Sequence, residues 1–246
     1  MLASTQAIVL RSIKYGETSL VVTMFTRVFG VQAYLVQGIR VASAKGRSSR
    51  AGLLQPATLL DVVAYRLPGQ HLQRLREFTP AHLYTSLQSE VVKNSIALFS
   101  VELLLRLIPQ EAEHPELFDL AFEYFQKLDA FPANAVANFP LYFIIMCSRA
   151  LGYELAGEYS QGTPNLNLRE GGFTADAPVV RPFVADEEAA AIARVLAVQR
   201  MEDLAAIEMN AGMRFRLIDW YLEFLHQHTQ HLGQIKSLGV LRTILH

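Results

Sequence analysis

The first eighty residues carry short runs of apolar, often β-branched residues that are separated by turn residues. Residues 31–37 alternate as a half-buried strand does, with Val31, Ala33 and Leu35 on one side and Gln32 and Tyr34 on the other. With glycine-containing turns between them, five strands are predicted, at residues 7–13, 19–26, 31–37, 58–66 and 73–78. Five short strands in this length favour a small closed barrel, with the OB-fold as leading candidate.

The hydrophobic period changes to that of helices from about residue 86. Helices are predicted at about 91–107, 114–129, 135–152, from 186 onward, and 206–231, with Asp186 as an N-cap. Residues 161–183 are rich in Gly and Pro and read as a flap or a degenerate small subdomain. The predicted organisation is therefore multidomain, β plus α. A barrel domain at 1–80 precedes a mainly helical domain at 81–246, with a loop-rich insertion at about 155–184.

Charge is divided between these two parts. Residues 1–80 carry ten Lys or Arg against three acidic residues, a net charge of +7, whereas the whole chain has a net charge of −1. Residues 81–246 therefore carry −8. Because a basic surface attracts polyanions, a small basic β-domain favours nucleic-acid binding, and the acidic helical part would face protein partners.

The connection between the third and fourth strands, residues 38–52, is low in apolar bulk and reads as a mobile loop. It presents cations and serines that suit phosphate contacts. Tyr34 is the better candidate for a surface aromatic that stacks on bases, whereas Phe25 is expected to face the core. The candidate DNA-binding residues are Arg27, Tyr34, Arg40, Lys45, Arg47 and Arg50. No base-edge readout motif is visible, so binding independent of sequence is expected.

No catalytic or cofactor motif occurs: there is no GxxxxGK[ST], GxGxxG, GxSxG, HExxH or CxxC. Cys147, the single cysteine, lies in an apolar helix and is expected to be buried. His226, His228 and His231 could approach a metal, but histidines near a helix C-terminus are favourable without one. We therefore expect no catalytic residues, no metal and no cofactor. The N-terminus is a poor signal peptide, and the longest apolar run is too short to span a membrane, so we expect a cytoplasmic protein.

Several short motifs follow one another along the chain in the same order as in a known protein family. They are AIVL, the YGETS turn, the segment from Thr26 to Gly30, G-x-R at 38–40, ELLLRLIPQE, PELFDL, LGY and KSLGVLR. Together they run nearly from end to end of the chain. On these motifs the sequence resembles the RecO family of bacterial DNA repair and recombination mediators.

The resemblance implies an N-terminal OB-fold, a helical domain and no enzyme activity in the usual sense. RecO-like proteins bind single- and double-stranded DNA and anneal complementary strands. With RecR, and in many bacteria RecF, they load the RecA recombinase onto DNA coated by single-strand binding protein, whose acidic, apolar C-terminal tail they contact. Many members carry a four-cysteine zinc site after LGY. Residues 159–176 here contain no Cys, so zinc should be absent and the subdomain reduced or held by packing.

Two other functions remain open at this stage. The chain could be a protein-interaction scaffold with little intrinsic DNA binding, in which the helical domain acts and the barrel only supports it. It could also be a metal-dependent nuclease or hydrolase whose carboxylates and histidines come from distant positions.

Overall fold

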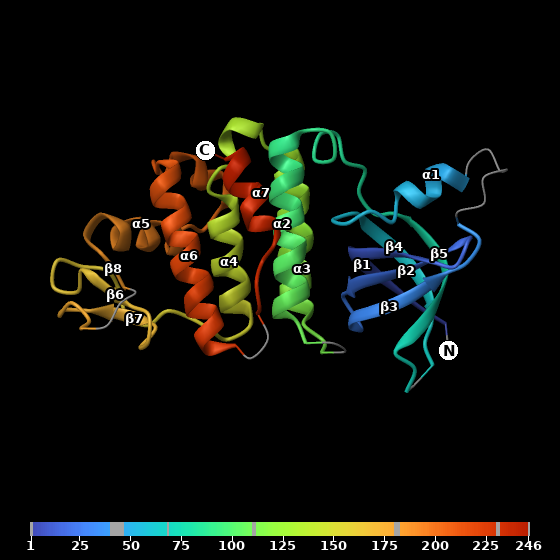
Figure 1. Cartoon of the computed structure of the whole chain (residues 1–246), viewed down its shortest axis with the longest axis horizontal. Helices are drawn as coiled ribbons and strands as arrows, with labels where there is room; N and C mark the ends of the chain where they lie inside the picture. Colours follow the sequence, from blue (N-terminus) through green and yellow to red (C-terminus); the bar gives the residue numbers. More distant parts are fainter. Residues whose placement is uncertain are drawn as a thin grey trace. The chain divides into compact units, whose positions relative to one another are not determined.

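The computed structural model describes residues 2–39, 47–67, 69–109, 112–179, 183–229 and 232–245. The chain forms two compact units (Figure 1). One comprises Met1–Thr85 and Ile108–Gln126, and the other comprises Ser86–Leu107 and Lys127–His246. The barrel unit therefore includes a segment from well beyond residue 80, and the domain boundary at 80 stays a prediction.

Five strands close into a barrel, drawn in blue to teal in Figure 1. They are β1 (Leu2–Tyr15), β2 (Ser19–Thr26), β3 (Gly30–Val36), β4 (Leu59–Tyr65) and β5 (Leu72–Pro80). Their order around the barrel is β1-β2-β3-β5-β4, and only the β3–β5 pair is parallel. The five predicted strands and the OB-like barrel are confirmed. Gly30 has a φ of 62°, as the tight β2–β3 turn requires.

The barrel interior corrects the prediction for Tyr34. Its side chain is 1% exposed and packs in the core with Val22, Met24 and Val36, so it is not a surface aromatic. Phe25 is buried as predicted, but on the outer side of the barrel, where its ring meets that of Phe118 edge-on at 5.3 Å. Because β2 and β3 bury residues on both faces, alternation could not show which face of β3 points inward.

The predicted mobile loop is partly helical. Residues 40–46 lie outside the described residues, and α1 (Arg47–Gly52) forms the end of the connection. The loop interpretation is therefore wrong for residues 47–52.

The second unit is built mainly from helices. They are α2 (Val91–Leu107), the end of α3 (Pro115–Ala130), α4 (Phe139–Ala150), α5 (Asp186–Leu196), α6 (Ala211–His228) and α7 (Ser237–Ile244), with 3-10 turns at Ala133–Ala135 and Met201–Ala206. Helix α2 packs against α4 and α7, and α4 packs against α6. None of the helices in the described ranges has the length and apolar character needed to cross a bilayer.

Three helix starts differ from the predictions. The helix predicted at 135–152 spans Phe139–Ala150 and follows a separate 3-10 turn. Asp186 does not cap α5: it has a φ of 48°, and Ala185 holds the N-cap position without a side-chain hydrogen bond. The helix predicted from residue 206 begins at Ala211, where the Asn210 side chain accepts a hydrogen bond from the Met213 amide at 2.8 Å. Helix α7 was not predicted, and Cys147 is buried as expected.

The insertion contains a small antiparallel sheet rather than only loop. Its strands are β6 (Asn165–Asn167), β7 (Gly172–Thr174) and β8 (Phe183–Ala185), in the order β7-β6-β8. The turn before it is held by hydroxyl groups. The Ser160 oxygen accepts hydrogen bonds from the amides of Gly162 and Thr163, and the Thr163 hydroxyl donates to the Glu158 carbonyl at 2.7 Å. The rings of Tyr159 and Phe173 meet edge-on.

Candidate nucleic-acid interface

A polar groove of about 450 Å³ lies on the barrel where β3 ends and α1 begins. Gly38 and Ile39 line it after β3, and Arg50 lines it from α1. Tyr65 at the end of β4 and Arg74, Arg76 and Phe78 on β5 complete it. Three arginines and an exposed tyrosine thus come together from three separate parts of the first eighty residues.

A β-bulge in β5 sets the direction of the Arg76 side chain. Val63 on β4 pairs with Glu77, but the next residue, Ala64, pairs with Leu75, so Arg76 has no partner on β4. The extra residue leaves Arg74, Arg76 and Glu77 all exposed, while Phe78 still points inward. Bulges commonly redirect a side chain in this way at binding surfaces. The Arg76 guanidinium lies 3.1 Å from the Glu77 carboxylate, a pair that is about half exposed.

Arg50 is held at the groove by an aromatic ring. Its guanidinium carbon lies 4.9 Å from the centre of the Phe78 ring, within the range of a cation–π contact. Tyr65 is 41% exposed and pairs with Arg74 across the β4–β5 ladder. Cations beside an accessible ring are the elements with which OB-folds hold single strands, because phosphates meet the cations and bases stack on the ring.

Of the six candidate residues from the sequence, the structure places one, Arg50, in the groove. The side chains of Arg40, Lys45 and Arg47 lie outside the described residues, although Arg47 begins α1. Tyr34 is enclosed in the barrel, where burial raises the pKa of its phenol to about 12. Arg27 lies on the β2–β3 turn, away from the groove lining, and is ion-paired with Asp119.

Sequence reasoning missed Arg74, Arg76 and Tyr65. Arg74 and Arg76 are two residues apart in a predicted strand, so they were a recognisable signal for cations on one face. The position of Tyr65 beside them follows from the β4–β5 register, which the sequence does not show.

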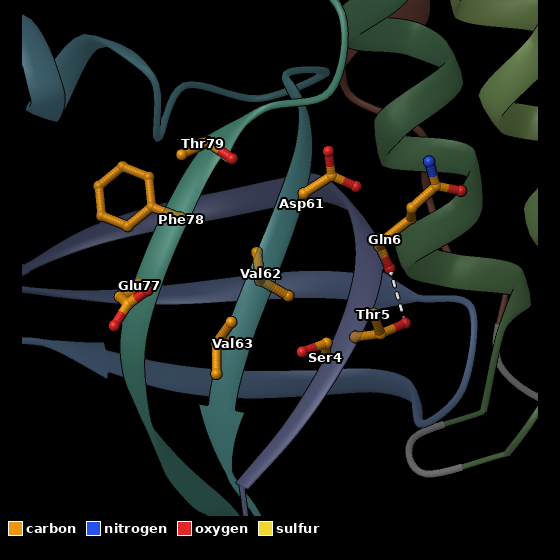
Figure 2. A pocket seen from close by; sticks show the side chains of 9 residues that line it. All are labelled: Ser4, Thr5, Gln6, Asp61, Val62, Val63, Glu77, Phe78 and Thr79. Atoms are coloured by element: carbon orange, nitrogen blue, oxygen red, sulfur yellow. Dashed lines mark hydrogen bonds between the residues drawn. The ribbon is translucent and has the colours of Figure 1, made fainter.

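A second hollow of about 370 Å³ lies over the outer face of β1, β4 and β5 (Figure 2). It contains the carboxylates of Asp61 and Glu77 among neutral polar side chains such as Ser4, Gln6 and Thr79. Because these carboxylates repel phosphate, this face of the barrel disfavours nucleic acid. The neighbouring residues Arg76 and Glu77 thus line two hollows of opposite charge.

The segment Ile108–Gln126 lowers the net charge of the barrel unit. It contains five acidic residues and no Lys or Arg, which reduces the net charge of the unit from +7 to +2. The net charge of the whole barrel unit is therefore only weakly positive, and the case for DNA binding rests on how the arginines of the groove are grouped. Among the described residues, no group of three or more His, Cys, Asp or Glu gathers as metal ligands would.

The strand order and the groove define the class of this protein as an OB-like barrel protein with an added helical domain. The family profile "Recombination protein O N terminal" matches residues 1–84, and "Recombination protein O C terminal" matches residues 88–238. The chain belongs to the RecO family of DNA repair proteins.

Individual relatives match over nearly their whole length. The DNA repair protein RecO of Bacteroides fragilis is 32% identical over 248 residues, which cover 99% of both chains. That of Christiangramia forsetii is 28% identical over 244 residues, with 99% of both chains covered. That of Salinibacter ruber is 29% identical over 247 residues, covering 98% of this chain and 93% of the relative.

Proposed function

We propose that this chain is a recombination mediator that binds single- and double-stranded DNA without sequence preference and anneals complementary strands. The observation that carries the proposal is the groove that Arg50, Arg74 and Arg76 line together with the exposed Tyr65. All four residues belong to the OB-like barrel of a DNA repair family. No covalent chemistry is required, so the chain acts without being an enzyme.

The mechanism follows from charge. Two complementary strands repel each other through their phosphates, and a basic groove that neutralises part of that charge lowers the barrier to their meeting. The three arginines bind phosphates, Arg76 in exchange for its single, half-exposed contact with Glu77, and Tyr65 stacks on a base of either strand. Because stacking and phosphate contacts read no base edge, binding is independent of sequence.

The connection between β3 and β4 carries further candidate DNA-binding residues. Its described ends, at Gly38 and Arg50, both line the groove. The residues between them include Arg40, Lys45 and Arg47. Their charge supports a part in DNA binding, because each Lys or Arg that meets a phosphate adds to salt-dependent affinity.

Protein partners would complete the activity. We expect a RecR-like partner, RecF in some pathways, and loading of RecA onto DNA coated by single-strand binding protein, all in the cytoplasm. A groove of about 710 Å³ in the helical unit suits the acidic, apolar tail of that coating protein. Tyr159, Phe173 and Leu196 offer apolar surface there, and Arg194 offers positive charge, whereas Arg149 is ion-paired with Glu154 at 3.5 Å. Glu154 and Glu158 also line it, so apolar contact must supply much of the affinity.

The decisive experiment is fluorescence-anisotropy binding of a labelled single strand across a salt series. Each phosphate contact steepens the log–log slope by about 0.7, so the variant R74Q/R76Q should flatten the slope by about 1.4. Arg11→Gln is the matched control, because Arg11 is an exposed barrel cation outside the groove lining. Reversing the charges at Arg40, Lys45, Arg47 and Arg50 tests the connection in the same assay.

Binding that is lost in the groove variant makes an annealing assay with complementary oligonucleotides the next step. Absence of binding by the wild-type chain at low salt would refute the proposal and favour a protein-interaction scaffold. Cleavage of the DNA with magnesium or manganese would instead support a nuclease.

A further inference from the structure

Helix α3 presents an acidic stripe on the barrel unit. Glu116, Asp119 and Glu123 follow one another at spacings of three and four residues, so they share one face of the helix, and all three are exposed. The opposite face is buried through Leu117, Phe118, Ala121, Tyr124 and Phe125. This amphipathic helix fixes a row of carboxylates on the unit that carries the arginine groove.

Apolar and steric contacts fix the segment to β2 and β3. The Phe118 ring packs edge-on against Phe25 of β2. Ala112, three residues before α3, approaches Gly30 so closely that a Cβ on Gly30 would overlap its carbonyl oxygen. The position of the acidic stripe relative to the β2–β3 turn therefore does not depend on charge.

Asp119 holds Arg27 in a two-pronged ion pair. The guanidinium Nε donates to Oδ1 at 2.7 Å and Nη2 donates to Oδ2 at 2.9 Å. The two side chains are 47% and 51% exposed. Arginine grips a phosphate with the same parallel pair of hydrogen bonds, so Asp119 occupies Arg27 as a phosphate would. An ion pair this exposed contributes little to folding stability.

Arg27 stands at the far end of β3 from the groove. The strand runs from Gly30, three residues after Arg27, to Val36, two residues before the groove-lining Gly38. At about 3.3 Å per residue, Gly30 and Val36 at the two ends of β3 are roughly 20 Å apart. Arg66 directly follows the groove-lining Tyr65, and its guanidinium lies 4.6 Å from the ring centre of Phe29, two residues after Arg27. Arginines therefore continue from the groove toward Arg27, where the acidic stripe begins.

We propose that Asp119 keeps Arg27 from binding nucleic acid. The backbone of a bound DNA strand then contacts only the groove side of the barrel and does not reach the β2–β3 turn. This inference rests on the proposed DNA binding. Asp119 then determines where a bound DNA strand runs on the barrel and how many of its phosphates the protein contacts. The surrounding carboxylates Glu116 and Glu123 repel a strand that strays past the turn.

The test is a double-mutant cycle on Arg27 and Asp119, read as the salt dependence of single-strand binding. In the wild-type background, Arg27→Gln should leave the slope unchanged, because Arg27 is already occupied. Asp119→Asn should steepen the slope by about 0.7 and lower Kd about two- to fivefold, because one more phosphate is engaged. The double variant R27Q/D119N should return to the wild-type slope.

Glu123→Gln is the matched control. It removes the same charge from the same stripe, one helical turn away, and should leave the slope unchanged. The proposal is overturned if E123Q and D119N increase DNA affinity equally and the increase remains when Arg27 is replaced. That result would show a general electrostatic effect of the lost negative charge. A loss of binding from R27Q alone would also overturn it. Melting temperatures within about 3 °C of wild type show that the variants remain folded.

The experiment distinguishes a failure of the proposed DNA binding from a failure of this inference. If the wild-type chain does not bind DNA and D119N does not either, the proposed function fails. If the wild-type chain binds and the cycle shows no coupling between Arg27 and Asp119, only the present inference fails.

Discussion

The Glu102 carboxylate of α2 accepts hydrogen bonds from Ser237, which lies 135 residues later at the start of α7. One oxygen accepts from the Ser237 amide at 2.8 Å and from its hydroxyl at 2.6 Å, and the other accepts from the Lys236 amide at 2.9 Å. These donors include amides that a helix N-terminus leaves without partners. Two of the motifs on which the family resemblance rests, ELLLRLIPQE and KSLGVLR, therefore meet at this contact.

Replacing Glu102 should destabilise the helical unit. Burial acts to raise the pKa of Glu102, but the hydrogen bonds from Ser237 and Lys236 outweigh it and lower the pKa below its usual value of 4.5. We expect Glu102→Ala to lower the free energy of unfolding by about 1–2 kcal/mol at pH 7, measured by urea denaturation. Because the native pKa is depressed, the contribution is full above pH 4.5 and is lost as the pH falls below it. The difference between variant and wild type should therefore shrink at acid pH; a difference that grew there would contradict this role.

Gly30 should tolerate no side chain. Gly30→Ala forces a Cβ against the Ala112 carbonyl at a φ of 62°, so we expect a loss of at least about 2 kcal/mol in thermal or urea unfolding. Gly38 is the control, because its φ is 65° but no atom lies within 4 Å of a Cβ there. Gly38→Ala should cost only about 1 kcal/mol. Equal costs at the two positions would mean that the contact with Ala112 is unimportant.

Tyr65 and Tyr34 should differ in their effect on DNA. Tyr65→Ala removes an exposed ring from the groove and should weaken single-strand binding by about 1–3 kcal/mol, whereas Tyr65→Phe keeps the ring and should bind nearly as wild type. Tyr34→Phe removes only a hydroxyl inside the barrel and should leave DNA affinity unchanged. Anisotropy titrations at one salt concentration make the comparison. A Tyr65→Ala variant with wild-type affinity would exclude base stacking at this ring.

The small sheet of the insertion should be stable without a metal. Ser160→Ala removes the acceptor for two turn amides and should lower stability by about 1 kcal/mol. Incubation with a chelator should leave the melting temperature of the wild-type chain unchanged. A fall in melting temperature that zinc restores would show that ligands outside the family pattern hold a metal.

Cys147 should report on unfolding of the helical unit. It is fully buried in α4, and burial raises the pKa of its thiol far above the usual value. Since the thiolate is the reactive form, alkylation of the native chain should follow the opening of this unit. Mass spectrometry across a urea series should show labelling that rises with the unfolding transition. Rapid labelling without denaturant would mean that α4 opens locally.

The elements were largely predictable because each depends on local patterns. The strands of the barrel and helices α2 and α3 follow from alternation, from the helical period and from proline and glycine positions. Which face of β3 points into the barrel was not predictable, because both faces are buried: Val31 lies on the outer side and Tyr34 lies within the barrel. The strands of the insertion are only three residues long, too short for a pattern to develop.

The candidate interface was only partly predictable for a related reason. The excess of cations in the first eighty residues is visible in the sequence, and Arg50 was selected from it. The groove itself depends on the bulge at Arg76 and on the pairing of Tyr65 with Arg74, which are properties of strand register. The ion pair between Arg27 and Asp119 joins residues 92 positions apart, and no local signal announces it.

The inclusion of Ile108–Gln126 in the barrel unit has a consequence for synthesis on the ribosome. The last strand of the barrel has been translated by residue 80, but the segment that covers Phe25 and belongs to the barrel unit ends only at residue 126. At 5–20 residues per second the nascent barrel waits roughly 2–9 s with an apolar side uncovered. During this interval the emerging chain is open to chaperones and to aggregation. A fragment ending near residue 85 would keep that exposure permanently.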